Sequence, residues 1–174
     1  MRRVEKTFPS PDREELVAAP PLSLRIFWRG GRIAQLSLGR AEVDALAPDA
    51  SDAARGLHAA LRSLAAGRPT AFPPLPLDWE RVPPFSRKVL RALYEHVPAG
   101  VTVTYGELAA LAGEGGKARA VGQVMARNPW PLVVPCHRVL GGDGALTGYT
   151  NPNGLDLKAL LLTLEGARPA GRGR

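Results

Sequence analysis

A proline-rich stretch divides this chain into two parts with different hydrophobic periodicities. Six prolines fall between positions 67 and 84, where neither a helical nor a strand period is present. Proline lacks a backbone N–H and clashes with the preceding turn of a helix, so such a stretch belongs neither in a helix nor inside a sheet. We therefore expect a linker here, with a separate folding pattern on either side of it.

The residues before the linker carry the signals of a small sheet and one helix. Residues 22–28 and 32–38 alternate apolar and polar side chains on either side of a Gly-Gly turn, which is typical of a β-hairpin. Residues 51–66 then change to helical spacing of their leucines. We interpret residues 3–8 as a short strand and residues 9–21, with four prolines, as a loop.

The residues after the linker show mainly helical patterns. Residues 85–96 and 155–164 both place apolar side chains at helical spacing. The chain therefore predicts an α+β fold, with a small N-terminal antiparallel sheet and a helix followed by a mostly helical C-terminal lobe. We expect an N-terminal lobe with its linker over residues 1–80, a helical lobe over residues 81–167 and a disordered basic tail over residues 168–174.

Two helices of the second lobe are expected to form a pair. Thr104 and Glu107 have the spacing of a capping box, which begins a helix at about Tyr105. A glycine-containing turn follows, and a second helix runs from Lys117 to about Arg127. In a basic protein this pattern indicates a DNA-binding helix-turn-helix, although helix pairs with glycine turns also occur simply as packing.

Charge and cysteine content limit the partners and the compartment. The chain has 23 Lys and Arg against 16 Asp and Glu, a formal charge of +7, which favours an anionic partner such as nucleic acid. An arginine-rich proteome would give the same excess. A single cysteine excludes a disulfide within the chain and a cysteine-rich zinc site, so we expect no metal. No apolar run has the length of a membrane span and no signal peptide is recognised, which predicts a cytoplasmic protein without a membrane partner.

The single cysteine, Cys136, lies in the apolar run 131–140 with His137 beside it. A neighbouring imidazole favours thiolate, which is the nucleophilic form of cysteine. The alternative is a small residue of the hydrophobic core, because free cysteine is among the most buried residue types. The local pattern leaves both interpretations open.

The wider sequence resembles the O6-alkylguanine-DNA alkyltransferases, also called methylated-DNA–protein-cysteine methyltransferases. Residues 135–139, Pro-Cys-His-Arg-Val, are similar to the reactive-cysteine motif of that family. Further family motifs follow in the family's order between about residues 85 and 166, whereas the N-terminal lobe matches only in outline. These motifs are Tyr105-Gly-Glu-Leu-Ala, Ala118-Arg119-Ala-Val-Gly122, Arg127-Asn128-Pro129, Gly148-Tyr149 and Leu161-Leu162 through Glu165-Gly166.

The resemblance implies DNA repair by a protein that reacts once. Members transfer the alkyl group of O6-alkylguanine, and of O4-alkylthymine, in double-stranded DNA to their own cysteine. By motif position Cys136 is the nucleophile, His137 is the base acting through a water, and Glu165 orients His137, as in a catalytic triad with a water inserted. The thioether product has no route back to a thiol, so we expect an irreversible reaction without a cofactor, carried out by a monomer.

The resemblance also assigns residues to the DNA and to the alkylguanine pocket. It implies that the nucleotide is flipped out of the duplex, that Arg119 fills the gap and that Tyr105 presses on the flipped nucleotide. The second helix faces the minor groove, where its small residues allow a close approach. The DNA-binding residues implied are Arg119, Tyr105, Ala118, Ala120, Gly122, Lys117 and Arg127. The pocket and hinge residues implied are Asn128, Pro131, Pro135, Arg138, Val139, Tyr149 and Thr150.

One departure and two alternatives accompany this resemblance. Residues 149–155 are longer than the corresponding family loop, which leaves the preferred size of the alkyl group open. A non-reacting alkyltransferase-like protein, which binds lesions or regulates through DNA binding, is the alternative; such proteins lack the cysteine that this chain keeps. A cysteine hydrolase is less consistent with the sequence, because nothing resembles an oxyanion loop.

Overall fold

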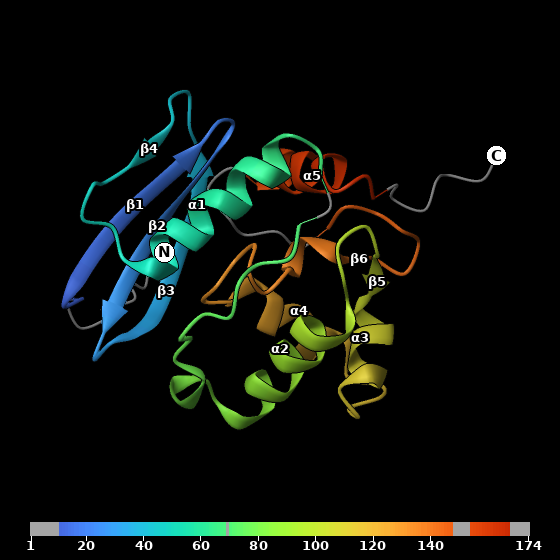
Figure 1. Cartoon of the computed structure of the whole chain (residues 1–174). Coiled ribbons are helices and arrows are strands. Elements are labelled where there is room, and N and C mark those ends of the chain that lie inside the picture. The colour runs from blue at the N-terminus through green and yellow to red at the C-terminus, as the bar shows by residue number, and fades with distance from the viewer. Residues whose placement is uncertain (1–10, 69, 148–153, 168–174) are drawn as a thin grey trace, which may run out of the picture.

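The computed structural model describes residues 11–68, 70–147 and 154–167, and its architecture confirms the predicted α+β class (Figure 1). A sheet with one helix against it forms the N-terminal half, and a group of helices forms the C-terminal half. The first half contains β1 (Arg13–Ala19), β2 (Leu22–Arg29), β3 (Arg32–Arg40), β4 (Ala45–Leu46) and α1 (Asp52–Ala65). The second contains the 3-10 helix η1 (Trp79–Arg81), α2 (Pro84–His96), β5 (Val103–Thr104), α3 (Tyr105–Leu111), α4 (Ala118–Ala126), the 3-10 helix η2 (Cys136–Arg138), β6 (Val139–Leu140) and α5 (Gly154–Leu164).

The predicted hairpin is confirmed, but the predicted loop before it is wrong. β2 and β3 pair antiparallel around Gly30 and Gly31, whose φ angles of 54° and 71° glycine adopts without steric cost. β1 replaces most of the loop expected at residues 9–21, and the sheet order is β3-β2-β1-β4. The prolines flank β1 and leave its hydrogen-bonding ladder intact, so they limit the strand without abolishing it. The strand expected at residues 3–8 lies outside the described residues.

Helix α1 is attached to the sheet through its partly buried capping residue, Ser51. The Ser51 side chain accepts a hydrogen bond from the Ala54 N–H (3.1 Å), which satisfies a free donor in the first turn. Ser51 in turn donates from its backbone and its hydroxyl to the Glu15 carboxylate of β1, at 2.8 and 2.7 Å. The leucines of α1 are buried on the sheet, as their spacing predicts; they are Leu57, Leu61 and Leu64.

The predicted helix pair is also present. Thr104 and Glu107 complete the capping box: the Glu107 N–H donates to Thr104 Oγ1 (3.2 Å) and the Thr104 N–H donates to Glu107 Oε2 (2.6 Å). Helix α3 begins at Tyr105, and α4 follows after residues 112–117 with its apolar face buried. The two helices pack against each other and against α2, which gives the helix-turn-helix arrangement.

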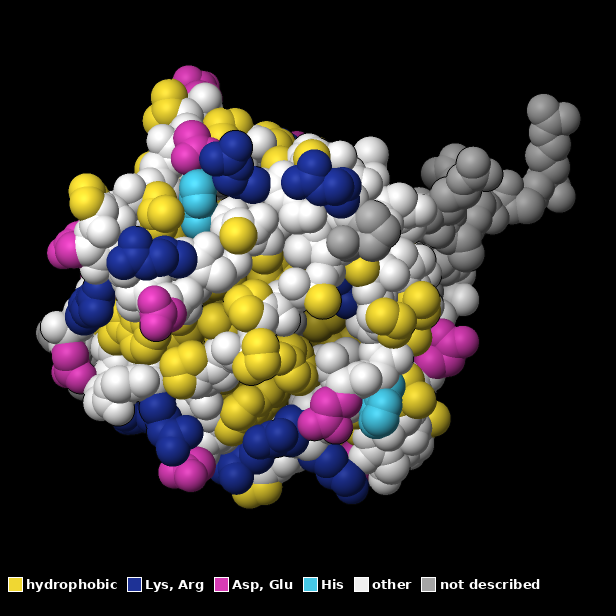
Figure 2. Space-filling view, in the orientation of Figure 1, with side chains coloured by type: hydrophobic (Ala, Val, Ile, Leu, Met, Phe, Trp, Pro, Cys, Tyr) yellow, Lys and Arg dark blue, Asp and Glu magenta, His cyan; other side chains and the backbone are white. Residues whose placement is uncertain are grey.

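The proline-rich linker joins the two halves instead of separating them. It runs along the open edge of β3, where the Ile33 N–H donates to the Pro76 carbonyl (2.8 Å) and the Asp78 N–H donates to the Ile33 carbonyl (3.1 Å). In Figure 1 it crosses the front of the molecule, and apolar side chains gather over its path in the same view in Figure 2. Residues 71–76 are all at least partly exposed to solvent, so the prolines among them leave apolar surface on the outside of the molecule.

One hydrophobic core runs through both halves. A single cluster of buried side chains includes Leu24 and Leu57 from the sheet and α1, and Val89, Val121 and Leu161 from the C-terminal helices. The division at residue 80 remains a prediction from the sequence. Across the described ranges, no helix combines the length and the apolar character needed to cross a membrane.

Candidate active site

Cys136 begins the short 3-10 helix η2 at the end of a buried loop. Its side chain is 6% exposed, and its N–H donates to the Val134 carbonyl (2.8 Å) across the turn made by Pro135. Within the same loop Leu132 has a φ of 74°. This backbone conformation is unfavourable for a residue with a side chain, so the surrounding packing must offset its cost. Leu132 is fully buried, so the packing that fixes this loop also fixes the position of the thiol.

Asn128, the residue expected to act as a hinge, ties the loop to the end of α4. Its Nδ2 donates to the Val134 carbonyl (2.8 Å), and its Oδ1 accepts from the Trp130 N–H (3.0 Å). Both hydrogen bonds span the turn that precedes the cysteine. An amide side chain that donates and accepts at once is required here, because a carboxylate has no N–H to donate.

His137, Arg138 and Glu165 form a buried charged network behind Cys136. His137 Nε2 lies 2.9 Å from Glu165 Oε1. Arg138 donates to both oxygens of the same carboxylate, from Nε at 3.0 Å and from Nη2 at 2.7 Å, and also donates from Nη1 to the Val97 carbonyl (2.6 Å). The side chains of His137, Glu165 and Arg138 are 0%, 2% and 8% exposed, so water screens these contacts little.

The charge of Glu165 decides which nitrogen of His137 carries a proton. Burial raises the pKa of Glu165, but the hydrogen bonds from His137 and Arg138 outweigh it and lower the pKa to about 2. An ionised carboxylate only accepts, so His137 Nε2 must donate to it. Burial lowers the pKa of His137, which favours the neutral ring and leaves Nδ1 as an acceptor. Nδ1 is buried and makes no hydrogen bond to the described residues, so it is the ring nitrogen able to accept a proton.

The surroundings of Cys136 favour its thiol form. Burial raises the pKa of the Cys136 thiol, while the Asn128 side chain and the Lys158 ammonium act to lower it. No hydrogen bond joins Sγ to the His137 ring among the contacts of the described residues. The relay through a water that the resemblance implies would join two groups that make no direct hydrogen bond here.

Lys158 is the site residue that sequence reasoning missed. It is 1% exposed, and its Nζ donates to the carbonyls of Val139 (2.7 Å) and Thr147 (2.8 Å). Burial lowers the pKa of Lys158 to about 8, and the nearby Cys136 opposes that shift. The position lies in a leucine-rich helical pattern where a lysine is expected to face solvent. Its one sequence signal is a charge between Leu157 and Leu161, both of which are buried.

Tyr105 is brought next to the cysteine loop by a short parallel ladder. Val103 and Thr104 of β5 pair with Val139 and Leu140 of β6, so the residue that begins α3 lies beside the strand that follows Cys136. The Tyr105 hydroxyl donates to the Thr147 carbonyl (3.1 Å), the same oxygen that Lys158 binds. Burial raises the pKa of Tyr105, so the hydroxyl keeps its proton and can donate it.

The outer surface of α4 carries the residues expected to meet DNA. Arg119 and Arg127 are exposed, whereas Ala118, Ala120 and Gly122 are partly covered. A Cβ on Gly122 would lie 3.8 Å from the Tyr105 ring, an ordinary van der Waals distance, so α4 packs beside that ring at this residue. Lys117 is also exposed, and its ammonium pairs with Glu114, which Lys88 of α2 binds as well (2.9 Å).

The remaining expected residues are divided between the loop and the undescribed segments. Pro131 and Pro135 lie in the cysteine loop, and Val139 is buried at the start of β6. Tyr149 and Thr150, like the tail at residues 168–174, lie outside the described residues. In the part of the chain that the structure describes, no three His, Cys, Asp or Glu side chains are grouped as metal ligands would be.

We expect Glu165 to make the folded protein sensitive to acid. Its pKa is about 2 when folded and returns towards 4.5 on unfolding, so the stability it contributes is present above pH 4.5 and is lost as the pH falls to about 2. This amounts to about 3 kcal/mol in total, of which about 2 kcal/mol is lost by pH 3. Urea unfolding at pH 7 and at pH 3 measures how much of the free energy of unfolding is lost between the two. In Glu165→Gln this loss should be smaller by about 2 kcal/mol than in the unsubstituted protein. The exposed Glu42→Gln is the control, and an unchanged acid loss in Glu165→Gln would contradict this assignment.

We expect Lys158→Met to raise the pKa of the Cys136 thiol further, because the variant keeps the side-chain length and removes the nearby cation. A rise of about one pH unit slows thiolate-dependent reactions about ten-fold at neutral pH. The pH profile of Cys136 alkylation by iodoacetamide measures this shift. Lys88→Met, which removes an exposed ammonium, should leave the profile unchanged. An identical profile in Lys158→Met and the unsubstituted protein would rule out an electrostatic role.

Sequence comparison places these residues in a known family. Residues 84–167 match the family described as 6-O-methylguanine DNA methyltransferase, DNA binding domain. The methylated-DNA–protein-cysteine methyltransferase of Methanosarcina acetivorans is 51% identical over 83 residues, which are 48% of this chain and 51% of that protein. The match thus spans about half the length of such curated relatives.

Structural comparison extends the similarity to nearly the whole chain. The crystal structure of the Mycobacterium tuberculosis O6-methylguanine methyltransferase is 33% identical, with a TM-score of 0.70, and the similarity covers 91% of this chain and 96% of that one. A structure of the M. tuberculosis protein in complex with DNA is 34% identical, with a TM-score of 0.70 and 87% and 91% of the two chains covered. With the reactive-cysteine motif and the helix pair already in place, this similarity shows that the chain belongs to the methylated-DNA–protein-cysteine methyltransferase family.

Proposed function

We propose that this protein repairs double-stranded DNA by moving the alkyl group of O6-alkylguanine onto Sγ of its own Cys136. O4-alkylthymine is the second substrate of this proposal. The observation that carries it is a buried thiol next to a neutral imidazole, whose unpaired Nδ1 can take a proton while Glu165 holds Nε2. Membership of the family supports the same chemistry.

The proposed reaction forms one bond and breaks one. His137 Nδ1 takes the thiol proton through a water, and the thiolate attacks the alkyl carbon in line with the C–O6 bond. The S–C bond forms as the C–O6 bond breaks, and the proton that left the thiol ends on the guanine. Because the thioether has no leaving group that a base could release, each molecule reacts once. The step needs no cofactor or metal.

Two further groups assist this step. The Tyr105 hydroxyl keeps its proton and donates a hydrogen bond to the guanine as negative charge develops on it. To do so it gives up its hydrogen bond to the Thr147 carbonyl. The Lys158 ammonium favours the thiolate over the thiol, since it lowers the pKa of Cys136. Both effects act in a buried site, where charges interact more strongly than in water.

The DNA contacts of the proposal lie on α4. Arg119 is exposed, and no ion pair holds it within the described part of the chain, so it is available to enter the base stack. Extruding a nucleotide costs about a few kcal/mol, which the inserted side chain and the pocket offset. The M. tuberculosis relative seen in complex with DNA supports this use of the fold. Lys117 and Arg127 add phosphate contacts that do not depend on sequence.

In this proposal the protein acts as a monomer in the cytoplasm. Residues 81–167 carry the reaction and the DNA contacts. Residues 1–80 support the hinge: the Trp130 indole donates from Nε1 to the Ile33 carbonyl of β3 (2.9 Å), and Trp130 itself donates from its backbone to Asn128.

The alkyl transfer is tested by intact mass. After incubation with a duplex that contains one O6-methylguanine, we expect one methyl group per protein, and peptide mapping should locate it on Cys136. Cys136→Ser should gain no mass and still bind the duplex. Binding without any mass change in the unsubstituted protein would instead favour a non-reacting lesion-binding protein.

The role of Arg119 is tested by comparing two substrates. Arg119→Ala should slow the reaction with duplex O6-methylguanine by about ten-fold or more, because the flipped state loses its support. Its reaction with the free O6-methylguanine base should stay unchanged. The exposed Arg62→Ala is the control for lost charge. Equal slowing of both substrates in Arg119→Ala would show that it does not act through base flipping.

A further inference from the structure

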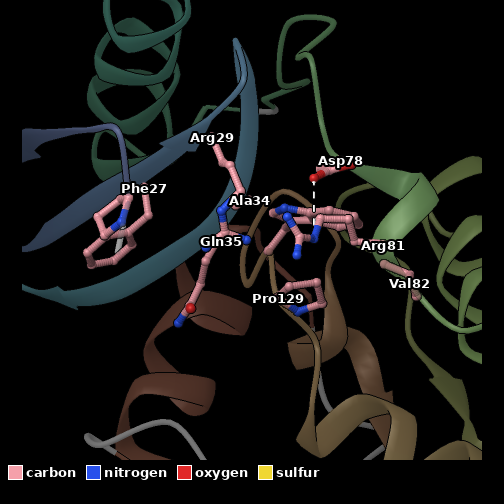
Figure 3. Close-up of a pocket in the computed structure, with 10 residues that line it drawn as sticks. Phe27, Arg29, Ala34, Gln35, Asp78, Arg81, Val82 and Pro129 are labelled. Carbon is pink, nitrogen blue, oxygen red and sulfur yellow. Dashed lines mark ion pairs between the residues drawn. The ribbon is translucent and has the colours of Figure 1, made fainter. Parts of the chain in front are cut away.

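One carboxylate binds two lysines beside the helix proposed to meet DNA. Glu114, in the turn between α3 and α4, accepts from the Lys88 ammonium of α2 at Oε1 (2.9 Å) and from the Lys117 ammonium at Oε2. In the pocket between the sheet and η1, by contrast, one cation faces one anion, since Arg81 Nε lies 3.9 Å from Asp78 Oδ2, as the dashed line in Figure 3 marks. At Glu114 two ammonium groups share one carboxylate, so the group of three keeps a single net positive charge.

The end of α3 fixes where this carboxylate lies. Gly113, just past the helix, has a φ of 67°, and the Glu114 N–H donates to the Ala109 carbonyl (2.8 Å), a common pattern of helix ends. The Glu114 side chain is 16% exposed, whereas those of Lys88 and Lys117 are 53% and 56% exposed. The carboxylate is therefore largely covered, while both ammonium groups can be reached by another anion.

The charge of Lys117 is held back from the outer surface of α4. Lys117 directly precedes α4, two positions before Arg119, but its ammonium lies 5.6 Å from the centre of the Phe85 ring of α2, where Glu114 also binds it. The hydrogen bonds from Lys117 and Lys88 lower the pKa of Glu114 to about 2, so the carboxylate is ionised at neutral pH. An ammonium group has three N–H donors, so each lysine keeps donors for a phosphate while Glu114 neutralises part of its charge.

Structural support alone is a weak reason for an acid at this position. Ion pairs of exposed lysines contribute little to stability, because water screens them. Glu114 is also the only acidic residue in the sequence between Glu107 and Asp143, a stretch that includes α4 and the cysteine loop. A carboxylate there repels the phosphates of a bound duplex and competes with them for the same ammonium groups. Its main effect is therefore expected on DNA binding.

We propose that Glu114 limits the affinity of this protein for the phosphate backbone of undamaged DNA by neutralising part of the charge of Lys88 and Lys117. This role rests on the DNA binding of the proposed function, and it adds Lys88 of α2 to the surface that meets the backbone. Phosphate contacts supply most of the binding to DNA that lacks a specific site. An acid that weakens them shortens the time that the protein spends on duplex without a lesion.

Binding of an undamaged duplex, followed by fluorescence anisotropy between about 50 and 200 mM salt, tests this role. Glu114→Gln keeps the size of the side chain and releases both lysines. We expect it to bind about ten-fold more tightly at the lowest salt, with a plot of log K against log salt that is steeper by about 0.9, as for one more neutralised phosphate. Glu14→Gln is the matched control, because it removes a carboxylate paired with Arg25 (2.6 Å) in the sheet, and it should leave the affinity unchanged.

A second substitution shows whether the gain acts through Lys88. Glu114→Gln combined with Lys88→Met restores the net charge of the group, so affinity and salt dependence should return to those of the unsubstituted protein, with circular dichroism to verify the fold. Equal affinity of Glu114→Gln and the unsubstituted protein, the same gain in Glu14→Gln, or a full gain in the double variant would overturn this role of Glu114. Alkyl transfer to Cys136 does not enter these measurements. Each of those results would therefore leave the proposed reaction standing, whereas absence of DNA binding in the unsubstituted protein would overturn both.

Discussion

The buried carboxylate of Glu165 is the contact on which the reactive half of the protein depends. Removing a carboxylate from water costs several kcal/mol, and only a full set of donors makes such a position stable. His137 and Arg138 supply those donors, and Arg138 also binds the carbonyl at the end of α2. One anion therefore joins the end of α5, the 3-10 helix of the cysteine and the end of α2. The hydrogen bond between His137 and Glu165 that holds these elements together also selects the tautomer of the His137 ring.

The surroundings of Cys136 act on the pKa of its thiol in opposite directions. Burial keeps the sulfur protonated, whereas Asn128 and Lys158 favour its ionised form. Neither effect requires the loop to move, because the Asn128 amide and the ladder between β5 and β6 hold it on two sides. Under the proposed function, a base that fills this site would exclude water and strengthen each of these electrostatic contacts. The proposed reaction would then depend on what enters the site.

The sequence predicted local structure well and long-range contacts poorly. The hairpin at Gly30-Gly31 and the capping box at Thr104 are set by neighbouring residues, so their patterns were sufficient. The resemblance supplied Cys136, His137 and Glu165 in order. β1 was missed because its flanking prolines dominate the composition of a short segment. Lys158 was missed because its burial depends on carbonyls of residues 139 and 147, which only the folded chain brings together. The contacts of Trp130 with β3 are non-local in the same way.

The docking of the linker on β3 has a consequence for solubility. An open strand edge presents unpaired N–H and C=O groups that can recruit a strand from another molecule and start aggregation. Here the backbone of residues 76–78 and the Pro129 carbonyl occupy groups along the β3 edge, and β4 at the opposite edge spans only Ala45–Leu46. The second half thus covers the edge of the sheet, and a change that loosens their junction would expose a template for intermolecular strand pairing.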